Sequence, residues 1–118
     1  MLNFSELVRI YVCLAPTDMR KSFDSLAALV REGLGYDPLS GHLFVFRSRR
    51  GDRVKLLWWN RDGLTLYYRR LEEGTFRFPA TGDPDARSIE VSSQELSLIL
   101  WGIDPASVKR QKRYQRTA

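Results

Sequence analysis

Hydrophobic and polar residues follow the clearest pattern between residues 43 and 78. Runs rich in Phe, Val, Leu, Trp and Tyr are separated there by short polar stretches that contain glycine. Such runs, bounded by turn residues, are typical of β-strands. Gly51-Asp52 and Asp62-Gly63 have the composition of two-residue hairpin loops. The pattern predicts a four-stranded antiparallel meander over residues 43–49, 53–61, 64–71 and 75–78.

These two loops determine which residues face each other across the strands. They place Phe46 opposite Leu57 and Trp59 opposite Leu66, and alternation along each strand then divides the meander into two faces. One face is apolar and is expected to form the core, whereas the other mixes aromatic and basic side chains. The predicted core face comprises Phe44, Phe46, Leu57, Trp59, Leu64, Leu66 and Tyr68, and the second face comprises Val45, Arg47, Val54, Leu56, Trp58, Tyr67 and Arg69.

A strand and a long helix are predicted before the meander. Residues 9–15 have the apolar composition of a strand, which Pro16 ends. Apolar residues then recur at helical spacing, so we expect a helix that is capped by Thr17 or Asp18 and continues to about Leu34. This helix is expected to cover the face that carries Phe44 and Trp59.

A short strand and a short helix are predicted after the meander. Residues 88–91 suit a strand, and Ser92 with Glu95 forms a capping box that begins a helix near residues 93–101. We expect this helix to close an edge or an end of the sheet. The predicted fold class is therefore α+β, an antiparallel meander of about four to five strands packed with one long and one short helix.

Basic side chains are clustered along the chain, whose 118 residues have a formal net charge of +5. Residues 47–78 hold nine basic and four acidic side chains, and residues 109–118 hold five basic and no acidic ones. Clustered basicity predicts a polyanionic partner. We expect a single domain over residues 1–105 and a basic, disordered tail over residues 106–118.

The sequence favours a cytoplasmic protein without catalytic activity. Apolar stretches reach only strand length, which predicts no transmembrane helix, and no signal peptide is recognisable. The single Cys13 and single His42 cannot form a zinc site, and no phosphate-binding glycine motif is present. We therefore expect no cofactor, no metal and no membrane partner.

The first hairpin is the main candidate for binding nucleic acid. Residues 47–55 combine five cations with one anion, and a two-stranded ribbon fits the major groove of DNA. The alternative is a solvated tip whose charges discourage edge pairing. Nothing in the pattern is aimed at base edges, so binding would be non-specific or based on DNA shape. The predicted hairpin contacts are Arg47, Arg49, Arg50, Arg53 and Lys55.

Two further groups of cations extend this prediction. Arg20 and Lys21 lie where the long helix is expected to start, and they could hold a phosphate or simply be solvated. The tail residues Lys109, Arg110, Lys112 and Arg113 would add electrostatic affinity, or would serve only solubility or an acidic protein partner.

The aromatic residues of the second face have two interpretations. Trp58 and Tyr67, with Arg47 and Arg69, could stack bases and contact phosphates, or they could form a second buried face. Trp58, Tyr67 and Trp101 could also anchor a protein interface, because Trp and Tyr are common at interface hot spots. A protein–protein adaptor without direct DNA contact is therefore the alternative function.

Several segments together resemble a known protein family. The matching segments are Arg9–Val12, Thr17–Leu26, Gly41–Phe46, Arg49–Leu57 and Trp59–Gly63. They are similar to TnpB, the short accessory protein of insertion-sequence-66 type transposable elements of bacteria, over about residues 5–103. Ser22 and Ser25 stand where that family commonly has glycine. The resemblance implies an accessory protein for DNA transposition that assists a separate DDE-type transposase, with transposon DNA and that transposase as partners.

Overall fold

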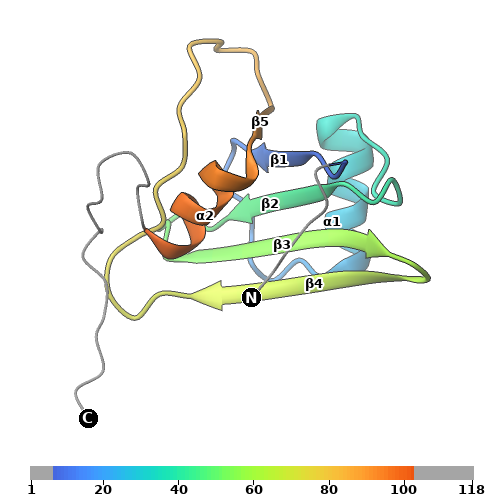
Figure 1. Cartoon of the computed structure of the whole chain (residues 1–118), viewed down its shortest axis with the longest axis horizontal. Helices are drawn as coiled ribbons and strands as arrows, with labels where there is room; N and C mark the ends of the chain where they lie inside the picture. The colour runs from blue at the N-terminus through green and yellow to red at the C-terminus, as the bar shows by residue number, and fades with distance from the viewer. Residues whose placement is uncertain (1–6, 103–118) are drawn as a thin grey trace.

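The computed structural model describes residues 7–102 as a mixed sheet with helices on both sides (Figure 1). The α+β class is thus confirmed. The helical segments are α1 (Phe23–Ala28), η1 (Leu29–Leu34), which continues α1 with π-helical hydrogen bonding, and α2 (Ser93–Trp101). The strands are β1 (Ile10–Cys13), β2 (Leu43–Arg47), β3 (Arg53–Asn60), β4 (Gly63–Arg70) and β5 (Ser88–Val91).

The strand order is β4-β3-β2-β1-β5, and the central strand β2 is parallel to its neighbour β1. The sheet is therefore mixed rather than antiparallel throughout, although β2, β3 and β4 do pair antiparallel as three strands of the predicted meander. The reason is the helix between β1 and β2, since a chain that crosses over through a helix returns in its original direction. β5 then adds an antiparallel strand at the outer edge of β1.

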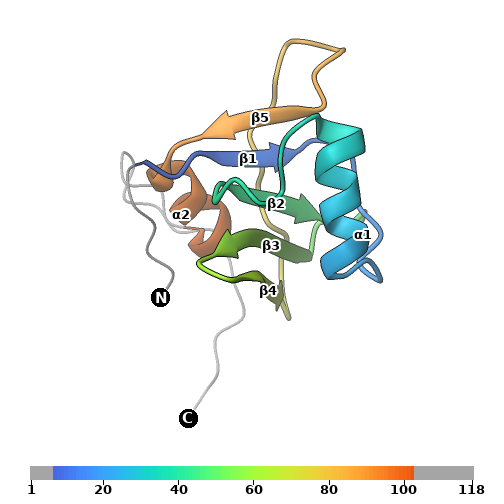
Figure 2. The same ribbon diagram turned by 90° about the vertical axis from the view of Figure 1, so that its right-hand side faces the viewer.

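The two faces of the sheet are covered by different helices, which Figure 2 shows on opposite sides. α1 and η1 place Leu26 and Val30 against Phe44, Phe46 and Leu57. This confirms the predicted core face and the helix that covers it. All five of these side chains have no accessible surface. Each such large apolar side chain contributes about 1.5–3 kcal/mol to folding.

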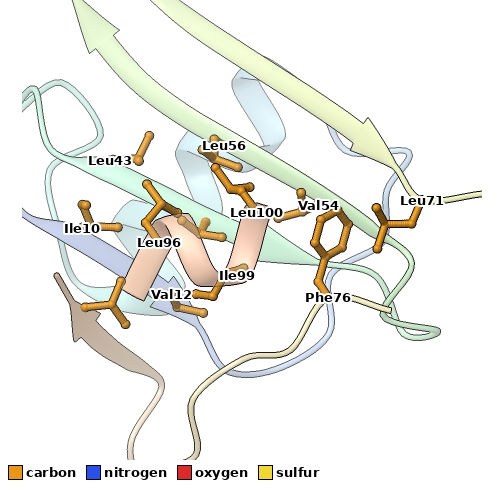
Figure 3. Packing of buried hydrophobic residues seen from close by; sticks show 12 residues of the cluster. Ile10, Val12, Leu43, Val54, Leu56, Leu71, Phe76, Leu96, Ile99 and Leu100 are labelled. Atoms are coloured by element: carbon orange, nitrogen blue, oxygen red, sulfur yellow. The ribbon is translucent and has the colours of Figure 1, made fainter. Parts of the chain in front are cut away.

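α2 packs on the other face of the sheet, not at an edge or an end as predicted (Figure 3). Leu96, Ile99 and Leu100 of this helix share a hydrophobic cluster with buried residues of β1, β2, β3 and β5, and Tyr67 of β4 packs against that cluster. The second face is therefore a second core. Its buried strand residues are Ile10, Val12, Leu43, Val45, Val54, Leu56 and Val91, and Leu71 and Phe76 close one end of it.

The loops of both hairpins differ from the prediction, the second in position by one residue and the first in length by two residues. Asn60 pairs with Gly63, so the second loop is Arg61-Asp62, and Arg61 adopts a positive φ of 59°. The first loop spans residues 49–52, between Arg47 paired with Val54 and a hydrogen bond from Ser48 N to Arg53 O. Each predicted cross-strand pair is thereby shifted by two residues, which leaves every side chain on its predicted face.

Residues 75–78 do not form the predicted fourth strand of the meander. The chain leaves the sheet after β4 and returns to the first hairpin, where Leu71 N donates to Asp52 O and Phe76 N donates to Gly51 O, both at 2.8 Å. Leu71 and Phe76 are not part of a strand, and their side chains are buried in the hydrophobic cluster under α2. This segment therefore supports the hairpin tip.

The capping predictions have different outcomes. Ser92 N donates to Glu95 Oε1 at 3.0 Å and Glu95 N donates to Ser92 Oγ at 3.1 Å, which confirms the capping box of α2. The first helix begins later than predicted, with Ser22 rather than Thr17 or Asp18 at its N-cap. Ser22 N donates to Ser25 Oγ at 2.9 Å. Residues 14–22 consequently form a loop beside the first hairpin.

Candidate nucleic-acid interface

The tip of the β2–β3 hairpin is a compact, internally bonded loop. Ser48 Oγ accepts a hydrogen bond of 3.1 Å from Arg53 N and donates one of 3.2 Å to Asp52 Oδ1. Gly51 N donates to Ser48 O at 3.1 Å, and Gly51 has a φ of 79°, which favours glycine. The sequence Ser-Arg-Arg-Gly-Asp-Arg thus encodes a tight turn that presents its arginines outward.

Two neighbouring segments hold this tip in place. On one side Thr17 N donates to Arg47 O at 2.8 Å, and the Arg47 guanidinium donates to Leu14 O at 2.6 Å. On the other side lie Leu71 and Phe76, whose backbone amides donate to Asp52 O and Gly51 O. The cationic tip is therefore positioned by contacts far apart in the sequence.

Arg49 and Arg50 are the free cations of the tip. Both are exposed. The ion pairs found within residues 7–102 are Arg9–Glu90, Arg20–Asp18 and Arg70–Glu72, and none of them involves these two arginines. Arg53, partly buried next to them, donates to the Tyr68 hydroxyl at 3.4 Å. Neighbouring carboxylates thus do not neutralise the tip in the described part of the chain.

An open cleft of about 470 Å³ separates the tip from the loop that precedes α1. Residues 16–19 line one side of the cleft, and the other is lined by Ser48, Arg49, Arg50, Asp52 and Arg53. Its rim therefore combines the free arginines with backbone of the neighbouring loop. A groove of this kind can receive a phosphate of a polyanion.

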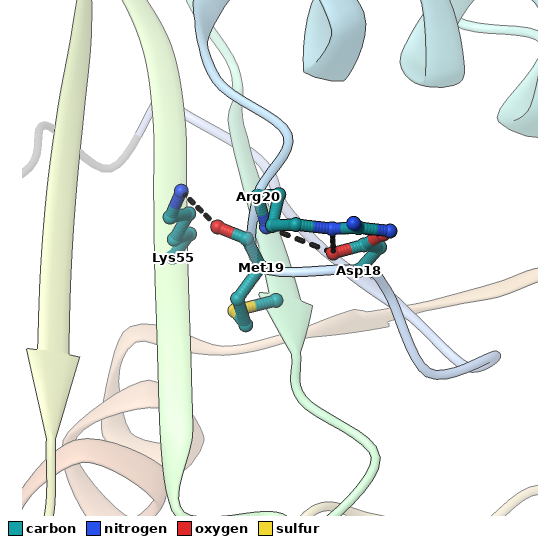
Figure 4. A network of polar contacts seen from close by, with 4 residues as sticks. All are labelled: Asp18, Met19, Arg20 and Lys55. Carbon is teal, nitrogen blue, oxygen red and sulfur yellow. Dashed lines mark hydrogen bonds and ion pairs between the residues drawn. The ribbon is translucent and has the colours of Figure 1, made fainter.

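Arg20 lies beside this cleft with its charge already partnered (Figure 4). Its guanidinium donates to Asp18 Oδ2 at 2.7 Å and 3.0 Å. The Arg20 hydrogen bonds lower the pKa of the Asp18 carboxyl to about 2. Arg20 and Lys21 precede the N-cap Ser22, so they are not in the first helical turn as the sequence suggested.

Lys55 is buried, so it is not one of the exposed cations of the hairpin. Only 5% of the residue is accessible, and Nζ donates to Met19 O at 2.7 Å (Figure 4). It also donates to Lys21 O at 2.6 Å. Nζ also lies 4.5 Å from the centre of the Tyr68 ring. Its donors are therefore used inside the protein, which argues against the predicted phosphate contact of Lys55.

Arg47 and Arg69 are also held by internal contacts. Arg47 bonds the Leu14 carbonyl and lies 5.6 Å from the centre of the Phe78 ring. Arg69 lies over the Trp101 ring at 4.3 Å. The structure thus brings Arg49, Arg50 and Arg53 together with Arg20 near one cleft, and it places Arg47 and Arg69 on the α2 side.

The aromatic residues of the second face are mostly part of the core. Trp58, Tyr67 and Trp101 are partly buried and pack against the cluster under α2. This favours the interpretation of a second buried face over a base-stacking platform at this place. Their accessible parts remain available to a protein partner.

Sequence reasoning missed a second hollow beside the tip, of about 360 Å³, that is lined by Arg53, Tyr68 and Arg70. Tyr68 was assigned to the core face, and it does lie on that face, but 48% of it is exposed. The sequence carried no signal for this exposure, because the helix was expected to begin at Thr17 or Asp18, whereas α1 begins only at Phe23.

The described residues also bear on the other predicted sites. Among residues 7–102 there is no group of three or more His, Cys, Asp or Glu side chains able to hold a metal ion. His42 Nδ1 accepts a hydrogen bond of 2.9 Å from Arg9 N.

No helix within residues 7–102 could span a bilayer. The tail cations Lys109, Arg110, Lys112 and Arg113 lie outside the described residues.

Comparison with known proteins gives a consistent result. A family model described as IS66 Orf2-like protein matches residues 8–110. The uncharacterized protein y4hO of Sinorhizobium fredii is 40% identical over 104 residues, covering 88% of each chain. The uncharacterized protein y4jC of the same organism is 38% identical over 111 residues, 94% of this chain and 92% of that one. No solved structure matches.

Proposed function

This chain belongs to the IS66 Orf2-like family, and from that premise we propose that it binds DNA of an insertion sequence through the tip of the β2–β3 hairpin. Members of the family are insertion-sequence accessory proteins and are not known to be catalytic. The proposal concerns what the accessory role consists of. According to this proposal, the chain contacts transposon DNA while a separate DDE-type transposase catalyses transposition.

One observation carries this proposal: Arg49 and Arg50 are exposed cations on a tip that is held by backbone hydrogen bonds from two sides. A cation on a positioned loop loses less conformational entropy on binding than one on a free arm. Arg53 lines the same cleft, and Arg20 follows the lining residue Met19, so both would extend the contact along the DNA backbone.

The proposed binding is directed at phosphates and not at bases. Arginines on a short loop can pair with phosphate oxygens of any sequence, and such contacts fix position without reading bases. Lys21 and the tail residues would raise affinity through counterion release. The protein would act in the bacterial cytoplasm, where the transposon DNA lies.

Affinity for a short DNA duplex, followed by fluorescence anisotropy at low salt, tests the proposal. Arg50→Gln removes a charge from the tip, and Arg61→Gln removes the same charge from the exposed loop at the far end of β3. Eight residues of strand separate the two ends by roughly 26 Å. We expect Arg50→Gln to weaken binding several-fold more than Arg61→Gln. Equal effects of the two variants would contradict a binding site at the tip.

A second candidate function is a protein–protein adaptor that docks the transposase. The observation in its favour is that Trp58, Tyr67 and Trp101 are only partly buried beside α2. Co-purification of the transposase that survives nuclease treatment and is lost in Trp101→Leu would support it. Co-purification that disappears with nuclease would indicate that DNA bridges the two proteins.

A further inference from the structure

Tyr68 is an exposed aromatic residue within the cationic surface. It lies on β4, an edge strand of the sheet, and 48% of it is accessible. Arg53 and Arg70 stand across from each other on β3 and β4, two residues from Tyr68 along β4, and the three residues line a common hollow of about 360 Å³. An aromatic ring flanked by two guanidinium groups is thus open to a ligand.

Packing inside the protein fixes the orientation of this ring. Lys55 Nζ lies 4.5 Å from the ring centre, and the Tyr68 hydroxyl accepts the 3.4 Å hydrogen bond from Arg53 Nη1. Lys55 is itself held by the carbonyls of Met19 and Lys21. One face of the ring is therefore occupied by a buried ammonium, so a base would have to stack on the opposite face.

The hollow around Tyr68 and the cleft at the hairpin tip are neighbours that share a lining residue. Arg53 lines both. A strand of nucleic acid whose phosphates contact Arg49 and Arg50 would therefore bring its neighbouring nucleotides to Tyr68. Stacking on an aromatic side chain needs a base with a free face, and a base within a duplex has both faces covered by its neighbours.

We propose that Tyr68 stacks on an unpaired base of single-stranded DNA whose phosphates are held by Arg49, Arg50 and Arg53. This rests on the proposed function and specifies its ligand, since the site would favour unpaired transposon ends over blunt duplex. Arg70 also takes part, although its guanidinium is shared with Glu72 at 2.9 Å. Charge complementarity selects nucleic acid over an apolar peptide at this edge.

The test compares one sequence as a single strand, as a blunt duplex and as a duplex with a single-stranded overhang. The wild-type protein should bind the single strand and the overhang about fivefold or more tighter than the blunt duplex. Tyr68→Leu keeps apolar volume without a π face and should lose about tenfold on the single strand with little change on the duplex. Tyr68→Phe keeps the ring and should stay within about twofold of the wild type.

Three outcomes separate this inference from the function on which it rests. No preference of the wild type for unpaired DNA, or equal losses for Tyr68→Leu on all three ligands, would overturn the stacking role. If Arg50→Gln weakens binding while Tyr68→Leu does not, the hairpin proposal stands and the stacking site is wrong. Photocrosslinking from a 5-iododeoxyuridine base to Tyr68, located by mass spectrometry, would support it directly.

Discussion

Lys55 donates a 2.6 Å hydrogen bond from Nζ to the backbone carbonyl oxygen of Lys21. The side chain of one predicted phosphate-binding lysine thus bonds the backbone of a second one. The same Lys55 ammonium also donates to Met19 O. These bonds attach residues 19–21 to β3. The loop that walls the cleft at the hairpin tip is therefore positioned by a cation that is not itself exposed.

Lys55→Met should destabilise the protein by about 1–3 kcal/mol, because it leaves two carbonyl oxygens without their donor in a buried place. Chemical denaturation measures this change. Arg50→Gln, at an exposed position, should alter the free energy of unfolding by about 0.5 kcal/mol or less. A Lys55→Met protein as stable as the wild type would contradict the structural role of Lys55.

The ion pair of Asp18 and Arg20 should be visible in a pH titration. The pKa of Asp18 is lowered from 3.8 to about 2 in the folded protein, so between these values the unfolded state binds more protons. The contribution of this pair to stability is present above about pH 4 and is lost as the pH falls toward 2. Carboxyl-carbon NMR should show the low pKa, and Arg20→Gln should return it toward 3.8. An unchanged Asp18 pKa in that variant would mean that the Arg20 side chain does not lower it.

The thiol of Cys13 should be unreactive in the folded protein. Burial raises its pKa above the ordinary value of 9.0, which disfavours the thiolate that reacts with disulfide reagents. Labelling near pH 8 should therefore be slow in buffer and fast in denaturant. The sign of the shift also means that stability falls as the pH rises above about 9, since the unfolded chain then loses this proton first. Equal labelling rates in buffer and denaturant would show that the thiol is accessible.

Gly51 should resist substitution because its φ of 79° lies in the left-handed region. Gly51→Ala should cost about 1 kcal/mol of folding stability. Gly63→Ala is the matched control, because Gly63 has no positive φ and an added Cβ there would meet nothing within 4 Å. Thermal unfolding of the two variants should therefore differ, with Gly51→Ala melting lower. Equal melting temperatures would contradict the described conformation of the tip.

Local patterns predicted the parts of this fold that depend on local sequence. The period of two along residues 43–70 gave the faces of β2, β3 and β4 correctly, and Ser92 with Glu95 gave the start of α2. The first loop is two residues longer than predicted and the second begins one residue earlier, because several turn types suit Arg-Arg-Gly-Asp and Arg-Asp-Gly. The assignment of side chains to the two faces remains correct, because each cross-strand partner is displaced by two residues.

Features that depend on contacts between distant segments were not predictable in the same way. The insertion of β1 between β2 and β5 requires the helical crossover, and residues 71–76 reach the hairpin only in the folded chain. A lysine in a basic run is normally exposed, so the burial of Lys55 had no sequence signal. Its partners are the carbonyls of Met19 and Lys21, which are free to accept its hydrogen bonds because residues 14–22 form a loop and not the predicted helix.

The most direct test of DNA binding by the hairpin tip is the salt dependence of affinity for the full chain and its Arg49→Gln/Arg50→Gln variant. Each phosphate contact contributes about 0.9 to the slope of log K against log salt concentration. Two lost contacts should therefore reduce the slope by about 1.8, whereas Arg61→Gln should leave it within about 0.5 of the wild type. Parallel slopes for all three proteins would show that the tip does not contact DNA.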